Sequence, residues 1–406
     1  MTLLGGPLVN KVGIKWSCVI ASLGYPMSGS AFYVRARFKI DDYLLAAKAI
    51  SGFTGGFLYV SESSAMLTYP YPDSRGFYLG IWAAMRNAGS VLGGAINFGN
   101  NSKASGAGSI AWGTYLIFVG IESTGCIWGL CLSQTKHVRR RDGSKINIPP
   151  TMSWLEEIKA LWPHATNKRV SKLPLKESFS CLTYQTFLMF IPAFYSFFCG
   201  GTYGTYLSLH FSVRSRAFSS FVMPIVAILV GLIYGRMLDM RKVSQKKRAW
   251  IGLIIWAVWQ GIALIWAGAI YAHYGKTKVA LDYKLQPGAF VVAWLPYLIM
   301  QATSYIVQMH IYWVLGTFST NLGANTRTGG LFRAFETAGQ AVSYGLNSHA
   351  GSDIRTPFYV NCAIFVLAIV SMSFLVKLVP ERAAAHDDVL EEYKGPAQGR
   401  MVVDTI

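Results

Sequence analysis

The sequence predicts an all-α polytopic membrane protein, and three observations lead to that fold class. Of the 406 residues, 52% are hydrophobic and only 14% are charged, whereas a soluble domain carries roughly 25% charged residues. Apolar stretches of about 20 residues, the length that a helix needs to cross the bilayer core, recur along the chain. The alternating polar and apolar strands of a membrane barrel do not occur in the sequence.

The strong positive charge has an explanation in membrane topology. The formal net charge is +18. Lysine and arginine concentrate in short connections, where the positive-inside rule places them on the cytosolic side. This pattern favours a membrane protein over one that binds nucleic acid. Residues 1–9 lack the basic region and the cleavage site of a secretory signal. We therefore expect the lipid bilayer, and no nucleic acid, as a partner.

Ten apolar stretches predict ten membrane spans, four before and six after a long basic segment at 133–178. If the spans alternate in direction, three parts share one side, which we assign to the cytosol. They are this segment, a short basic connection at 239–248 and the C-terminal tail at 380–406. The expected spans are 15–34, 43–69, 76–98, 110–132, 179–208, 217–238, 249–272, 289–318, 329–349 and 357–379.

One N-glycosylation sequon, Asn100-Asn101-Ser102, occurs in the sequence and falls on the opposite, non-cytosolic side. Asn100 is therefore a candidate glycosylation site. The spans indicate an integral, multi-pass membrane protein, and the sequence leaves both the plasma membrane and an endomembrane open as its location.

Inside the long basic segment, the stretch SWLEEIKALWP at 153–163 predicts an amphipathic helix. Ser153 and Glu156 have the spacing of a capping box, and Pro163 is expected to end the helix. The apolar side chains fall on one face, which we expect to lie along the cytosolic lipid surface. The alternative is that this face docks on a partner protein. Its members are Trp154, Leu155, Ile158, Leu161 and Trp162.

The stretch GPLVNKVGIK at 6–15 resembles the loop motif G-x-L-x-D-R-x-G-x-K of the major facilitator superfamily, which joins the second and third of twelve helices. Asn10 stands at the acidic position of that motif. A weaker copy, GRMLDMRK, follows the sixth expected span, in the place of the loop that joins helices eight and nine. The gating-loop candidates that the resemblance implies are Gly6, Asn10, Lys11, Gly13, Lys15, Gly235, Asp239 and Arg241.

The two motif copies number the expected spans as helices three to twelve. The resemblance therefore implies a two-bundle, major-facilitator-type architecture with about ten of the twelve helices present, and we expect the chain to be incomplete at its N-terminus. The expected parts are an incomplete N-terminal bundle at 1–132, a cytosolic basic linker at 133–178, a six-helix bundle at 179–379 and a cytosolic tail at 380–406.

Four further stretches resemble the Unc-ninety-three-like branch of that superfamily, especially its fungal members. Asn10 and Glu336 depart from the pattern of the branch. The stretches are SESSAMLTYP at 61–70, DSRGFYLGIWAAMRNAGSVLGG at 73–94, QMHIYWVLGTFSTN at 308–321 and RAFETAGQAVSY at 333–344.

Ionisable residues inside the spans are the candidate functional residues, because each costs at least ~2.5 kcal/mol in lipid unless it is paired or faces a cavity. MRNAGSV at 85–91 aligns with FETAGQAV at 335–342, so Arg86 and Glu336 occupy equivalent places in the two halves. Binding groups near the midplane of internal repeats are typical of secondary transporters. The alternative is a static ion pair that holds helices together. The substrate or coupling candidates are Glu62, Arg86, His310 and Glu336.

The same reasoning assigns partners to the charged side chains. We expect a carboxylate, either Glu62 or Glu336, to bind Arg86. Lys48 and Arg333 are expected near span ends, where their side chains reach the interface. Glu122 is expected to be a structural partner rather than a ligand.

No enzyme motif occurs in the sequence, and no cofactor or metal ion is expected. The six cysteines lack metal-ligand spacing, and HAGSD at 349–353 is expected in a short loop. The leading hypothesis is a transporter that moves an unknown small solute by alternating access. The alternative is a non-transporting regulator or trafficking partner of another membrane protein, with the long linker and the tail as its working surfaces. An inactive truncated product also remains open.

Overall fold

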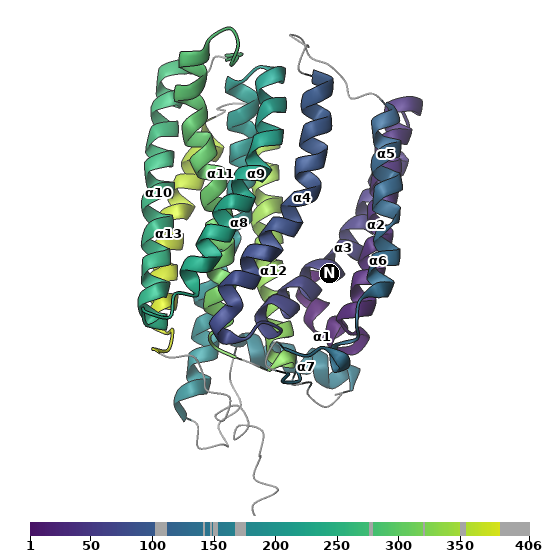
Figure 1. Ribbon diagram of the computed structural model, residues 1–406, viewed down its shortest axis with the longest axis vertical. Helices are drawn as coiled ribbons and strands as arrows, with labels where there is room; N and C mark the ends of the chain where they lie inside the picture. Colours follow the sequence, from purple (N-terminus) through teal and green to yellow (C-terminus); the bar gives the residue numbers. More distant parts are fainter. Residues whose placement is uncertain are drawn as a thin grey trace, which may run out of the picture.

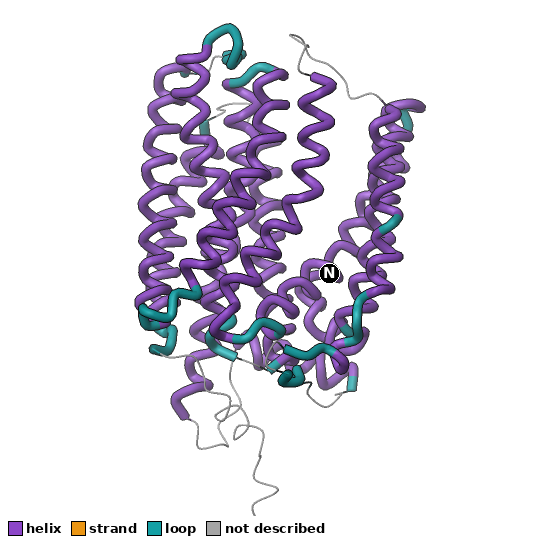
Figure 2. The backbone as a smooth tube through the Cα atoms, in the orientation of Figure 1, coloured by secondary structure: helices purple, strands orange, loops and turns teal. Residues whose placement is uncertain are grey.

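The computed structural model is built of α-helices, labelled α1 to α13 (Figure 1). The structure describes residues 1–101, 112–140, 143–146, 148, 153–166, 176–275, 279–319, 321–349 and 355–381. No strand is present among them; Figure 2 shows long helices joined by short loops. The predicted all-α fold class is confirmed.

The long helices follow the expected spans closely. Within the described residues, six helices are long and apolar enough to cross a membrane by length and composition: α3, α8, α9, α10, α11 and α13. The helices in span order are α2 (Ile14–Phe38), α3 (Asp42–Thr68), α4 (Arg75–Asn101), α5 (Trp112–Ser123) with α6 (Gly125–Cys131), α8 (Lys176–His210), α9 (Val213–Leu238), α10 (Gln245–Tyr274), α11 (Pro287–Leu315), α12 (Leu322–His349) and α13 (Thr356–Lys377).

The expected span at 110–132 is wrong in one respect, because it is broken at Thr124 into α5 and α6. The Thr124 hydroxyl donates to the carbonyl of Ile121 at 2.7 Å, and its backbone N–H donates to the same carbonyl at 3.1 Å. Side-chain bonds of this kind compete with the helical ladder and bend helices. The apolar periodicity continues through the break, so the sequence pattern does not mark it.

The turn of the first motif copy lies at Gly13. Helix α1 (Thr2–Val12) ends before it and α2 begins after it. Gly13 has φ 83°, a conformation that glycine adopts without steric cost. Gly6 lies where α1 meets α12, since a Cβ there would lie 2.9 Å from the Cα of Arg327. The two motif glycines therefore set the turn and the close approach of α1 to α12.

Helix α4 lies between two groups of helices and packs mainly against α9. In Figure 1 it stands between α8–α13 on the left and α2, α3, α5 and α6 on the right. It packs along α9 at small residues, which allow close backbone approach. The facing positions are Gly76 with Gly235, Gly80 with Gly231, and Gly94 with Ser220. Whether the expected parts 1–132 and 179–379 are separate bundles stays a prediction.

The main hydrophobic core lies among α8 to α13, with α3 and α4 contributing at its edge. Its largest fully buried apolar side chains include Trp256, Trp313 and Phe332. The outer faces carry exposed apolar side chains such as Ile265, which is 78% exposed. Exposed apolar surface of this kind suits a lipid environment.

Helix α7 (Trp154–Thr166) is the expected amphipathic helix. The capping box is confirmed: the N–H of Ser153 donates to Glu156 at 2.8 Å, and the N–H of Glu156 donates to the Ser153 hydroxyl at 3.2 Å. These bonds lower the pKa of Glu156. The expected end at Pro163 is wrong, because a proline can kink a helix without ending it, and α7 continues to Thr166. The side chain of Trp162 lies outside the described residues.

Candidate solute site and the contacts at the α7 end

Arg333 lies at the centre of a buried ionic cluster. It lies on α12, and its side chain is 0% exposed. Its Nη1 atom lies 2.7 Å from Oε2 of Glu336, one turn further along the same helix. Its Nη2 atom lies 3.1 Å from Oε2 of Glu62 on α3. One guanidinium therefore binds two carboxylates and connects α3 with α12.

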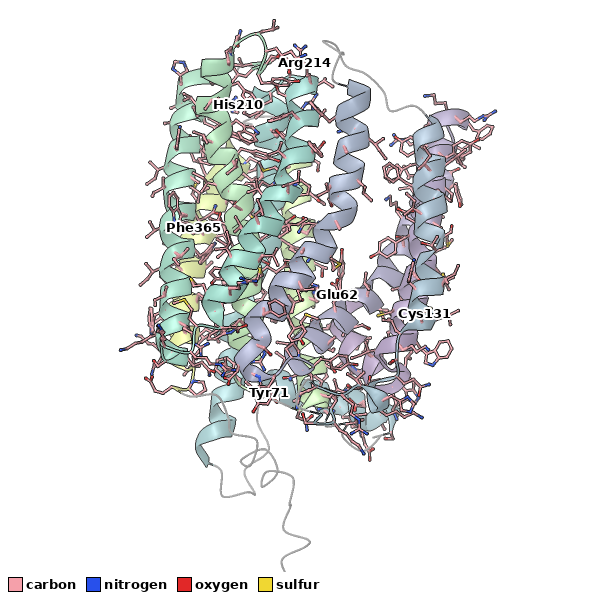
Figure 3. All side chains as sticks on the ribbon, viewed as in Figure 1. Glu62, Tyr71, Cys131, His210, Arg214 and Phe365 are labelled. Atoms are coloured by element: carbon pink, nitrogen blue, oxygen red, sulfur yellow. The ribbon has the colours of Figure 1, made fainter. Side chains whose placement is uncertain are left out.

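Two neutral side chains extend this cluster to other helices. Ser196 of α8 and Gln308 of α11 each donate to Oε1 of Glu336 at 2.9 Å. The amide oxygen of Gln308 accepts from Nη1 of Arg86 on α4 at 3.1 Å. We call the whole set the polar network: Glu62, Arg86, Ser196, Gln308, Arg333 and Glu336. Figure 3 places Glu62 inside the helix assembly, between Tyr71 near one end and His210 and Arg214 at the other.

Aromatic rings enclose the two guanidinium groups. Arg333 lies over Tyr59 and Tyr312, with its Cζ 5.1 and 5.3 Å from the ring centroids. Arg86 lies over Trp82 and Phe197 at 5.3 and 5.7 Å. Cation–π contacts of this kind partly replace the water that a buried cation loses. The rings therefore help to keep both charges inside the helix assembly.

The expected pairing of Arg86 with a carboxylate is wrong. Both candidate carboxylates, Glu62 and Glu336, bind Arg333 instead, and Arg86 donates a hydrogen bond to Gln308. The expectation that Arg333 reaches the interface is also wrong. Helix α12 begins at Leu322, seven residues before the expected span, so Arg333 lies roughly 16 Å along it at 1.5 Å per residue.

Gln308 and Ser196 are functional candidates that sequence reasoning missed. Both are buried, at 4% and 5% exposure, and both bind Glu336. A search for ionisable residues passes over neutral side chains. The available signal is an amide inside an otherwise apolar stretch, which a membrane helix tolerates only when its hydrogen bonds are made.

His310 lies apart from the polar network. Its Nδ1 atom lies 2.7 Å from the hydroxyl of Tyr234 on α9, and the ring is fully buried. The ring also packs against α10, because a Cβ added at Gly252 would lie 2.6 Å from the nearest ring atoms. The structure therefore places His310 in a packing contact among α9, α10 and α11.

Lys48 and Glu122 lie at the periphery, on α3 and α5. Lys48 is exposed; its ammonium donates to the Ser28 hydroxyl at 2.6 Å and lies 4.0 Å from the centroid of the Phe32 ring. Glu122 packs against α2, since a Cβ at Gly29 would lie 2.7 Å from its Oε2. Neither side chain reaches the polar network.

The second motif copy clamps α9 to α4. Asp239, directly after α9, accepts the backbone N–H groups of Gly76 and Phe77 at 2.8 and 2.6 Å. These groups belong to the first turn of α4, where the helix dipole favours a negative charge. Burial nevertheless raises the pKa of Asp239. Arg241 makes a loose ion pair with Asp73 at 3.9 Å, and its side chain is 80% exposed, so this pair adds little.

The first motif copy makes its contact through α7. Asn10 donates from Nδ2 to Oε2 of Glu157 at 3.2 Å. The same oxygen binds Nη2 of Arg327 on α12 at 2.9 Å. Lys11 lies 5.8 Å from the centroid of the Trp154 ring, and Lys15 lies over Trp16. We call the end of the molecule where these contacts and Asp239 lie the α7 end.

The remaining predictions from the sequence fall at the opposite end or outside the described side chains. Asn100 lies in the last turn of α4, at the end of that helix opposite to Asp239, but its side chain and Ser102 lie outside the described residues. The same holds for the side chain of His349 and for residues 350–354. Within the described part of the chain, no group of three or more His, Cys, Asp or Glu could hold a metal ion.

Comparison with known proteins shows which relatives the sequence is similar to. No family model matches the sequence. The notoamide biosynthesis cluster protein O' of Aspergillus versicolor is 29% identical over 373 residues, which cover 92% of this chain and 77% of that protein. UNC93-like protein 1 of Arabidopsis thaliana is 24% identical over 384 residues, covering 93% and 79%.

The fold comparison agrees with these relatives. The E. coli fucose:proton symporter FucP aligns with a TM-score of 0.60 at 13% identity, over 92% of this chain and 87% of that one. The chain is similar to UNC93-like proteins and has the major facilitator fold. The resemblance drawn from the motifs is thereby confirmed. It is a multi-pass integral membrane protein whose fold is that of the major facilitator transporters.

Proposed function

We propose that this UNC93-like protein moves a small solute by alternating access, with the polar network as its solute site. The observation that carries the proposal is Arg333, fully buried between Glu62 of α3 and Glu336 of α12. A buried ion pair is weak evidence for stability, because desolvation offsets much of its attraction. In transporters, however, such groups lie between the moving halves and mark the substrate pathway.

Arg86 is the residue that we propose to contact the solute. It is half-buried, and it donates a hydrogen bond to the neutral amide of Gln308. Both carboxylates of the polar network are already bound to Arg333. An anionic group on the solute would complete the coordination of Arg86, because a guanidinium binds a carboxylate with two parallel hydrogen bonds. The rings of Trp82 and Phe197 would flank the remainder of the solute.

The test is uptake into vesicles that contain the purified protein. Organic anions are compared with their neutral amides, for example benzoate with benzamide, and vesicles with the Arg333→Ala variant provide the background. Accumulation of an anion above background, without accumulation of its amide, supports the proposal. Absence of uptake for every pair, together with a membrane protein that co-purifies in stoichiometric amount, would instead favour a regulator or trafficking partner.

A further inference from the structure

The two motif copies differ at the position that carries the acid. In the second copy Asp239 binds the first turn of α4 directly. In the first copy the corresponding position is Asn10, which carries no charge. The helix that the first copy faces is α12, where Gly6 lies against the backbone of Arg327. An uncharged Asn10 cannot form an ion pair with that arginine.

A carboxylate is nevertheless present at this place, and it comes from α7. Oε2 of Glu157 accepts from Asn10 and binds Arg327 at 2.9 Å. The two side chains of the ion pair are 7% and 13% exposed. A charged hydrogen bond so little exposed is stronger than one at an open surface. Glu157 therefore joins α1, α7 and α12 at one point.

We propose that Glu157 is the gating carboxylate of the first motif copy and replaces the acid that Asn10 lacks. Helix α7 then acts as a latch: while Glu157 binds Arg327, the α7 ends of α1 and α12 stay together. The latch opens when this pair breaks. The proposal rests on alternating access for its role in transport, but the contact itself is tested without any solute.

The outer face of α7 fits a latch that is held from one side. Trp154, Leu155 and Ile158 are exposed at 52%, 61% and 48%, whereas Glu157 is buried on the inner side. The helix therefore presents a charged contact to the protein and an apolar surface outward. Removing the charge of Glu157 should weaken the inner contact and leave the outer face unchanged.

Hydrogen exchange of the whole protein in lipid nanodiscs measures the latch, read by mass spectrometry over residues 2–12 and 322–332. In Glu157→Gln, both segments should exchange roughly tenfold faster, the change expected when a charge-assisted hydrogen bond is lost. Glu156→Gln is the matched control: it removes the same charge one residue away, and glutamine still completes a capping box. Its exchange should equal that of the unaltered protein.

A second variant tests whether Glu157 supplies the acid of the motif or only holds α7 in place. Adding Asn10→Asp to Glu157→Gln returns an acid to the motif position, next to Arg327. The slow exchange of 2–12 and 322–332 should then be restored. Exchange as fast as in Glu157→Gln alone would overturn the proposal, and so would unchanged exchange in Glu157→Gln. If Glu157→Gln does not fold, the charge swap Glu157→Arg with Arg327→Glu is measured, and failure of the swap to restore slow exchange is equally decisive.

Discussion

Two buried polar sites of this protein differ in which helices they join. The polar network connects α3 and α4 with α8, α11 and α12, and it contains four charged side chains. The His310 contact joins α9, α10 and α11 through one hydrogen bond to Tyr234. Both sites contain an ionisable residue deep in a span. Ionisable character alone therefore does not separate the proposed solute site from a packing contact, and the two sites differ in the helices that they connect.

The largest expected effect is the removal of the charge at the centre of the polar network. Arg333→Ala leaves the carboxylates of Glu62 and Glu336 buried without their cation. Breaking a buried pair in this way costs about 3–5 kcal/mol, so we expect a large loss of thermal stability in detergent and no transport. Adding Glu336→Gln should recover part of the loss. A loss under ~1 kcal/mol would remove the distinction between the two sites.

The His310 contact should affect stability without affecting transport. Gly252→Ala introduces a methyl group that meets Tyr234 and His310, and overpacking of this kind costs about 1–3 kcal/mol. Gly261→Ala on the same helix is the matched control, because its nearest neighbour, Phe365, lies at 3.9 Å. The control should be neutral or stabilising. If Gly252→Ala leaves stability unchanged but abolishes uptake, the assignment of His310 to helix packing is wrong.

Arg86 should show the opposite behaviour. Its neighbours Gln308 and Trp82 need no countercharge, so Arg86→Gln should change the free energy of unfolding by only about 1 kcal/mol. Uptake of anions should be lost, and Arg86→Lys should retain part of it because the charge remains. Unaltered anion uptake by Arg86→Gln, measured in the same vesicles, would contradict the assignment of Arg86 as the solute contact.

The smallest effect is expected at a third polar site, at the end opposite to α7. Burial tends to raise the pKa of Asp282, but hydrogen bonds from Ser212 and Lys284 and the charge of Arg214 lower it overall. A carboxyl whose folded pKa is lowered contributes stability above its unfolded pKa of about 3.9, and that contribution is lost as the pH falls through the folded pKa.

Thermal unfolding between pH 3 and pH 7 measures this contribution. Asp282→Asn should cost about 1 kcal/mol at neutral pH, and the difference from the unaltered protein should shrink as the pH falls below ~4. A difference that stays constant with pH, or grows in acid, would show that the charge of Asp282 does not stabilise the fold.

The helices were largely predictable, because apolar stretches of membrane length mark them directly. The ends of the helices were less predictable, and one wrong helix start changed the prediction for Arg333. The first turns of α12 are polar, so the span was expected to start at residue 329, whereas the helix begins at Leu322. The late start placed Arg333 near the interface in the prediction. Glu62 and Glu336, which the sequence offered as alternative partners of Arg86, both bind Arg333 instead.

The missed residues share a physical reason. Gln308 is neutral, so the cost of burying a charge does not reveal it. Glu157 lies on α7, and the sequence pattern of an amphipathic helix predicts a glutamate on its solvent-exposed face. Its partners Asn10 and Arg327 are 147 and 170 residues away in sequence. Contacts over such separations are set by the packing of α1, α7 and α12 and have no local pattern.

The most direct test of alternating access is the distance between spin labels at the two ends of the molecule. Exposed positions suit the labels: Tyr71 with Met240 at the α7 end, and Leu116 with Leu285 at the other. On a cysteine-free background, alternating access predicts two distance populations for each pair. Glu157→Gln should lengthen the first distance while it shortens the second. One fixed distance at both ends, unchanged by Glu157→Gln, would contradict alternating access.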